Sequence, residues 1–87
     1  MINYDWIEDT VEDAISEARS MGFPYNSIFI EAAEQILEGV YREYDREGFE
    51  DLLRYLRNNH FGRARGEAKP MLDNLLYHVL DIVSFGR

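Results

Sequence analysis

The stretch from Asp5 to Glu17 carries only negative charges, and it constrains the fold more than any other feature of the sequence. Its six carboxylates belong to Asp5, Glu8, Asp9, Glu12, Asp13 and Glu17. At about 100° per residue, they cover about half the circumference of an α-helix. The opposite side carries an apolar stripe of Ile7, Val11, Ala14, Ile15 and Ala18. This pattern predicts an amphipathic helix with one face in a core and one purely anionic face.

The carboxylates of this stretch are dense and repel one another. Six charges over roughly 18 Å of helix give one charge per ~3 Å, close to the ~3.4 Å spacing along one strand of B-DNA. The like-charged pairs four residues apart are Asp5/Asp9, Glu8/Glu12, Asp9/Asp13 and Asp13/Glu17. Each pair repels by ~0.2–0.5 kcal/mol, so the four destabilise the helix by roughly 1–2 kcal/mol before screening. Solubility alone is one explanation of such a face, and the retained repulsion favours a second, in which the face binds a partner.

Charge is distributed unevenly along the chain. Residues 1–51 hold 14 acids and three bases, a net charge of −11, whereas residues 52–87 hold three acids and six bases, a net charge of +3. The acids that extend the negative field are first Glu31, Glu34 and Glu38, and then Glu43, Asp45 and Glu47. The bases that gather in the second part are Arg54, Arg57, Arg63 and Arg65. We expect this basic patch either to contact phosphate groups or to pair with acids of the protein itself or of a second copy.

Length and composition predict one small soluble domain. The chain has 87 residues, a net charge of −8 and 46% hydrophobic residues, which is enough for a single core. It has no Cys, which fits a reducing cytosol and leaves no thiolate metal site. Acids near the N-terminus interrupt any signal-peptide pattern, and the apolar segment 71–85 is too short and too polar to span a bilayer. We therefore expect a cytoplasmic protein that does not contact membranes.

Hydrophobic periodicity predicts an all-α bundle of about four helices in a single domain over residues 1–87. The expected helices span about Tyr4–Met21, Ser27–Arg46, Phe49–Asn58 and Pro70–Phe85, with Gly48 ending the second and residues 60–68 forming a loop. The fourth helix is apolar on nearly every side. It is expected either at the centre of the bundle or in a homodimer interface, through Leu72, Leu76, Val79 and Val83.

The sequence offers little catalytic chemistry. His60 and His78 have no metal-ligand spacing, and a hydrogen bond at the helix edge is the simpler role for His78. No phosphate-binding glycine loop and no nucleophile motif is present. Carboxylates on an amphipathic helix are better explained as a solvated face than as general acids and bases. We expect no enzymatic activity, no cofactor and no metal.

Aromatic residues form a separate group of candidates. Six that could stack on nucleic-acid bases are Trp6, Tyr25, Tyr41, Tyr44, Tyr55 and Tyr77. Most of them fall on or beside apolar faces, so the sequence favours core or interface positions over base stacking.

The acidic stretch and the segment that follows it together resemble a known protein family. Asp9, Asp13-Ala14-Ile15, Ala18, Pro24-Tyr25 and Ile28-Phe29 resemble the acidic helical antirestriction DNA mimics of phages, of the Ocr type. The small acidic chain is also similar in style to phage anti-CRISPR proteins. The resemblance covers about residues 9–33 and implies a protein that blocks the nucleic-acid-handling surface of a host defence nuclease or CRISPR effector without catalysis. The Arg-rich segment from Arg54 to Lys69 departs from this pattern, because a uniform DNA mimic has no need of it.

The sequence therefore predicts a phage-type inhibitor that presents an acidic helical surface to a basic nucleic-acid-binding groove. The expected contact residues are Asp5, Glu8, Asp9, Glu12, Asp13, Glu17, Glu31, Glu34 and Glu38. Direct binding to nucleic acid is not expected. Two alternatives stay open: a helical homodimerisation or adaptor module, and a nucleic-acid binder that uses the basic patch.

Overall fold

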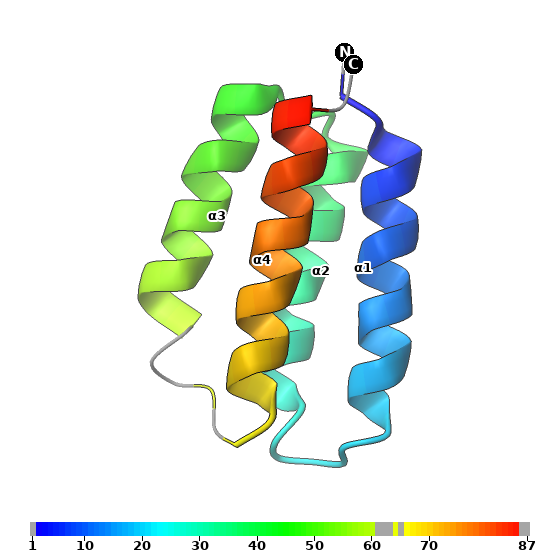
Figure 1. Cartoon of the computed structure of the whole chain (residues 1–87), viewed down its shortest axis with the longest axis vertical. Helices are drawn as coiled ribbons and strands as arrows, with labels where there is room; N and C mark the ends of the chain where they lie inside the picture. Colours follow the sequence, from blue (N-terminus) through cyan, green and yellow to red (C-terminus); the bar gives the residue numbers. More distant parts are fainter. Residues whose placement is uncertain (1, 61–63, 65, 86–87) are drawn as a thin grey trace.

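The computed structural model describes residues 2–60, 64 and 66–85, and these residues form a bundle of four α-helices with no strand among them (Figure 1). The helices are α1 (Tyr4–Arg19), α2 (Ser27–Tyr41), α3 (Arg46–His60) and α4 (Ala68–Phe85). The all-α single-domain prediction is confirmed at the level of fold class. None of the helices in the described part of the chain is long and apolar enough to cross a membrane.

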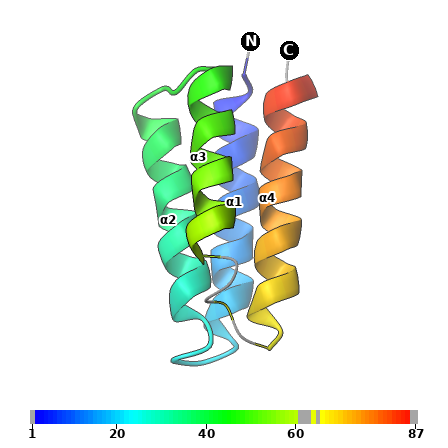
Figure 2. The same cartoon turned by 90° about the vertical axis from the view of Figure 1, so that its left-hand side faces the viewer.

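Each helix runs antiparallel to the next one along the chain (Figures 1 and 2). α1 packs on α2 and α4, and α3 packs on the same two helices from the other side. α2 and α4 also contact each other, so they form the inner diagonal of the bundle. The short connections explain this arrangement, since a few residues can join only neighbouring ends of antiparallel helices.

The apolar face of α4 lies inside the bundle. The sequence placed Leu72, Leu76, Val79 and Val83 either at the centre of the bundle or in a homodimer interface. Their exposed fractions are only 0%, 6%, 0% and 3%. They pack in one core with Ile7, Val11, Phe29, Ile36, Phe49 and Leu56, all fully buried. The chain itself therefore covers this face. The four residues pack in the core and are not left open for a homodimer interface.

α1 begins and ends close to its predicted bounds. The Asn3 side chain accepts a hydrogen bond from the backbone N–H of Trp6 at 3.0 Å, which caps the first turn. The helix ends at Arg19, two residues before the predicted end at Met21. Gly22 follows with φ of 78°, a left-handed conformation that glycine adopts without a steric penalty.

The connection from α2 to α3 differs from the sequence prediction. α2 ends at Tyr41 rather than near Arg46, in a Schellman motif: the N–H of Tyr44 donates to the carbonyl of Gly39 at 3.0 Å, and the N–H of Glu43 donates to the carbonyl of Val40 at 3.0 Å. Glu43 occupies the left-handed position of this motif, with φ of 54°, which glycine usually fills. The absence of a glycine there hides the helix end in the sequence.

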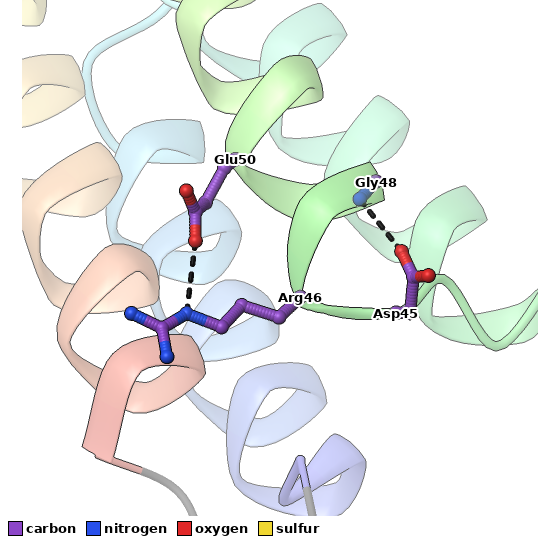
Figure 3. A network of polar contacts seen from close by, with 4 residues as sticks. All are labelled: Asp45, Arg46, Gly48 and Glu50. Atoms are coloured by element: carbon purple, nitrogen blue, oxygen red, sulfur yellow. Dashed lines mark hydrogen bonds and ion pairs between the residues drawn. The ribbon is translucent and has the colours of Figure 1, made fainter.

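Gly48 lies in the first turn of α3 and does not terminate α2. Its N–H donates to the Asp45 side chain at 2.8 Å, so Asp45 is the N-cap of α3 (Figure 3). The next residue, Arg46, pairs with Glu50 one turn further along α3, at 2.9 Å. α3 thus starts three residues before the predicted start at Phe49 and runs to His60, two residues beyond the predicted end.

α4 begins at Ala68, two residues before Pro70. The backbone of Lys69 donates to the carbonyl of Gly66 at 3.4 Å, so the helix is already forming when the chain reaches Pro70. A proline is tolerated in the first turn because the N–H groups there have no partner within the helix. The predicted loop over residues 60–68 is shorter than expected at both ends, because His60 is the last residue of α3 and Ala68 is the first of α4; residues 61–63 and 65 lie outside the described residues.

Candidate protein interface on the acidic surface

All nine carboxylates expected to bind a partner lie at the surface of α1 and α2. Eight are exposed, and Glu8 is half-buried. We call this set the acidic surface; it comprises Asp5, Glu8, Asp9, Glu12, Asp13, Glu17, Glu31, Glu34 and Glu38. Because α1 and α2 lie side by side, the structure places these acids on adjoining helices of the bundle (Figure 1). Over residues 4–42, nine carboxylates stand against only Arg19 and Arg42, a net charge of −7.

The acids of α1 fall into groups that point in different directions. Glu8 and Glu12 lie on the side next to α2, where both interact with Tyr41. At about 100° per residue, Asp9 and Asp13 point away from the core, on the outer side of the helix. A partner that touches all six acids must therefore wrap around half of the helix.

A shallow groove of about 300 Å³ follows the line where α1 meets α2. Its polar lining comes from both helices and consists of Glu12, Ser16, Arg19, Glu34 and Tyr41, and its apolar lining is Ile15, Ile30 and Leu37. The structure thus brings Glu12 and Glu34 to one site, which the sequence did not predict. Arg19 also lines this groove, so it is the guanidinium group of α1 that offsets part of the negative charge.

Tyr41 joins the two helices across the upper part of this surface. Its hydroxyl donates a hydrogen bond to the Glu8 carboxylate, and this bond is the main reason why the pKa of Tyr41 is raised. Partial shielding from water and the negative charges of Glu8 and Glu12 raise the pKa further. The ring is 65% exposed, so Tyr41 offers a partner an aromatic surface among carboxylates.

Glu31 and Glu38 lie on the outer side of α2. Glu38 pairs with Arg42 one turn later, with 2.9 Å between the guanidinium nitrogen and the carboxylate oxygen. Both side chains are more than half exposed, and such a pair contributes at most about 1 kcal/mol. Arg42 therefore reduces the local charge but leaves Glu38 accessible.

The described part of the basic patch, Arg54 and Arg57, lies on α3 and is already engaged. Arg54 pairs with Asp51 of its own helix at 3.2 Å, and the Arg57 guanidinium stands 5.7 Å from the centre of the Tyr77 ring, a cation–π distance. Both arginines line a groove of about 280 Å³ between α3 and α4. Arg63 and Arg65 lie outside the described residues.

Of the two positions expected for the aromatic residues, core or interface, the structure excludes the core for most of them. Of the six, only Tyr44 is half-buried, and the exposed five are Trp6, Tyr25, Tyr41, Tyr55 and Tyr77. A core position is therefore wrong for these five. For Trp6 the signal was present in the sequence, because this residue lies about 120° from the centre of the apolar stripe of its helix. The sequence reading also missed two exposed phenylalanines, Phe23 and Phe85.

Within the described residues, no group of three or more His, Asp or Glu side chains is placed to hold a metal ion.

Comparison of the chain with protein-family models, curated proteins and solved structures found no match. The arrangement of the surface therefore carries the functional argument by itself. It consists of an anionic two-helix surface with exposed aromatic rings, on a rigid bundle.

Proposed function

We propose that this protein inhibits a nucleic-acid-directed host defence complex, of the restriction or CRISPR type, by occupying a basic nucleic-acid-binding groove with its acidic surface. The observation that carries the proposal is the excess of carboxylates over guanidinium groups on α1 and α2. A groove that binds phosphates attracts such a surface over long range. The acidic surface then competes with nucleic acid for the groove. The inhibitor needs no catalytic residue, only a rigid display of charge.

Three features of the surface support the proposal. The acids are carried by helices rather than loops, so their spacing is fixed before binding. Neighbouring acids on α1 repel one another, as in the pairs Asp9/Asp13 and Asp13/Glu17, at a cost to the stability of the helix. Arg46 and Arg54 pair with acids of α3, and Arg57 stands over the Tyr77 ring of α4, so these contacts do not neutralise α1 and α2.

Charge reversal at matched positions tests the proposal. Changing Glu8, Glu12 and Asp13 together to Lys should abolish binding to the target complex. The matched control changes Glu43, Glu47 and Glu67 to Lys, three exposed acids outside the acidic surface that give the same change in net charge. If both triple variants lose binding equally, net charge and not this surface is responsible, and the proposal fails.

Salt and competition measurements test the mechanism. Association with purified restriction enzymes and CRISPR effector complexes should slow steeply as salt rises, since the Debye length falls from ~30 Å at 0.01 M to ~10 Å at 0.1 M. Cognate DNA or guide RNA should displace the inhibitor. Salt-insensitive binding that coexists with bound nucleic acid would contradict the proposal and favour an adaptor role.

The basic patch supports a second candidate, direct binding of nucleic acid through α3 and α4. The specific observation is the groove where Arg54 and Arg57 flank the exposed ring of Tyr77. Changing Arg54 and Arg57 to Glu distinguishes the two functions. This double variant should bind the defence complex as the wild type does if the acidic surface is responsible. It should lose a salt-sensitive interaction with DNA or RNA if the basic patch is responsible.

A further inference from the structure

A third groove, of about 300 Å³, lies between the first turns of α1 and the last turns of α4, at the end of the bundle where α1 begins and α4 ends (Figure 1). It is lined by Trp6, Thr10, His78, Asp81, Ile82 and Phe85. Trp6 is 56% exposed and Phe85 is 73% exposed. Two large aromatic side chains therefore flank one groove and remain open to solvent.

Both rings are carried by helical residues, so their backbone positions are set before any partner arrives. The backbone of Trp6 is held by the Asn3 cap, and the next residue, Ile7, is fully buried. On the other side of the groove, Ile82 is buried in the core while Phe85 ends α4. Tryptophan is among the residue types that most often dominate the affinity of a protein interface.

The rim of this groove is negatively charged. Asp9 lies one turn from Trp6 on α1 and is exposed, and Asp81 lines the groove from α4. Asp13, a further turn along α1, points in nearly the same direction as Trp6. Such a rim repels nucleic acid and anionic lipid, and it repels the same rim on a second copy. It favours a cationic protein surface.

We infer that the Trp6–Phe85 groove anchors the interface by taking an apolar side chain that is flanked by Arg or Lys on the partner protein. The inference rests on the proposed function, because it assigns a specific contact to the basic partner proposed there. Carboxylates of the acidic surface speed the encounter, and the groove holds the complex by desolvating the two rings. The two contributions affect different rates, since exposed charges act mainly on association and buried contacts act on dissociation.

Trp6 is the single tryptophan of the chain, so its fluorescence reports on the groove directly. The probe is a hexapeptide with a Leu-Phe centre and two Arg on each side. We expect a saturable blue shift of Trp6 emission with this peptide. We expect none with a peptide that has an Ala-Ala centre, and none with one that carries Glu in place of Arg. No shift with the first peptide, or equal shifts with all three, would overturn the inference even if the protein inhibits a defence complex.

The same groove is tested in the full complex with two alanine variants. Trp6→Ala should raise Kd at least tenfold, mainly through faster dissociation, and leave the salt dependence of association unchanged. The matched control is Phe23→Ala, which removes an 85% exposed ring at the opposite end of the bundle and should change Kd less than twofold. Equal affinities of Trp6→Ala and wild type would overturn the anchor while leaving the electrostatic proposal intact.

Two other occupants of the groove give distinct results. A Trp6 blue shift that grows with protein concentration alone, together with a doubled mass in light scattering, would assign the groove to a second copy of the chain. A shift with anionic phosphatidylglycerol vesicles would assign it to a lipid surface. Either outcome contradicts a cationic protein partner.

Discussion

The hydroxyl of Tyr4 donates a hydrogen bond to the backbone carbonyl of Tyr44 at 2.7 Å, which joins the first turn of α1 to the connection between α2 and α3. The two tyrosine rings lie 6.3 and 5.8 Å from the ring of Phe49, which is fully buried at the start of α3. Three helices are thus fastened together at one end of the bundle. This end also carries Tyr41 and Trp6, so the same contacts support the aromatic part of the proposed interface.

Removing the Tyr4 hydroxyl should weaken this junction. Tyr4→Phe keeps the ring against Phe49 and leaves the Tyr44 carbonyl without that donor, so we expect a loss of about 1 kcal/mol in the free energy of unfolding. Urea denaturation followed by circular dichroism measures the change. The control, Tyr25→Phe, removes a hydroxyl from a 58% exposed ring and should change stability by less than about 0.5 kcal/mol. Equal effects of the two substitutions would show that the hydrogen bond does not stabilise the fold.

The fold class was predictable because each helix repeats its apolar residues with helical spacing. The boundary between α2 and α3 was not predictable, because its signals depend on contacts between the helices. Gly39 lies within α2, where an added Cβ would stand 3.1 Å from the rings of Phe49 and Tyr44. Glycine serves close packing at this position, while the left-handed position of the helix end is filled by Glu43. Local rules that equate glycine with a helix end therefore misplace this boundary.

The left-handed conformation of Glu43 predicts a stabilising substitution. Glu43→Gly should raise the free energy of unfolding by about 0.5–1 kcal/mol, since relief of the steric penalty of a Cβ at positive φ outweighs the added freedom of the unfolded chain. Thermal and urea unfolding measure the gain. Glu43→Gln is the matched control, because it removes the same charge and retains the Cβ. If the two variants are equally stable, the effect is electrostatic and the backbone argument is wrong.

The acidic surface was predictable as a set of residues but not as a shape. Spacing along one helix placed Asp5 to Glu17 on a common half of α1, and exposure agrees with it. The groove shared by Glu12 and Glu34 arises only when α1 and α2 pack, so no local pattern reports it. The same holds for the groove between Trp6 and Phe85, whose two residues are almost the whole chain apart.

The raised pKa of Tyr41 gives a pH prediction. A phenol whose pKa is higher in the folded state favours folding while it is protonated, so its stabilising effect is present below pH ~10 and is lost as pH rises through the folded-state pKa. The difference in tyrosinate absorbance between wild type and Tyr41→Phe should therefore titrate above the usual value for tyrosine.

Two carboxylates serve as a matched pair for this titration. Glu8→Gln removes the charge of the hydrogen-bond acceptor and should move the titration of Tyr41 back toward the ordinary value. Glu31→Gln removes an exposed charge from α2 and should leave it nearly unchanged. A titration that responds equally to both substitutions would mean that Tyr41 senses the overall negative charge and not Glu8.

Repulsion along α1 predicts that stability and binding can be changed in opposite directions at Asp13. This residue is exposed and stands four residues from both Asp9 and Glu17, so Asp13→Lys replaces two repulsive pairs with two attractive ones. We expect the free energy of unfolding to rise by about 0.5–1.5 kcal/mol at low salt, and the gain to shrink in 1 M NaCl as screening removes both effects. Asp13→Asn, which removes only the repulsion, should give about half of the gain.

The Asp13→Lys substitution should also slow association with the defence complex, because it places a positive charge in the middle of the acidic surface. Higher stability together with weaker binding would mean that Asp13 serves partner binding at a cost to the stability of the helix. Higher stability with unchanged binding would mean that this part of the surface serves only solubility.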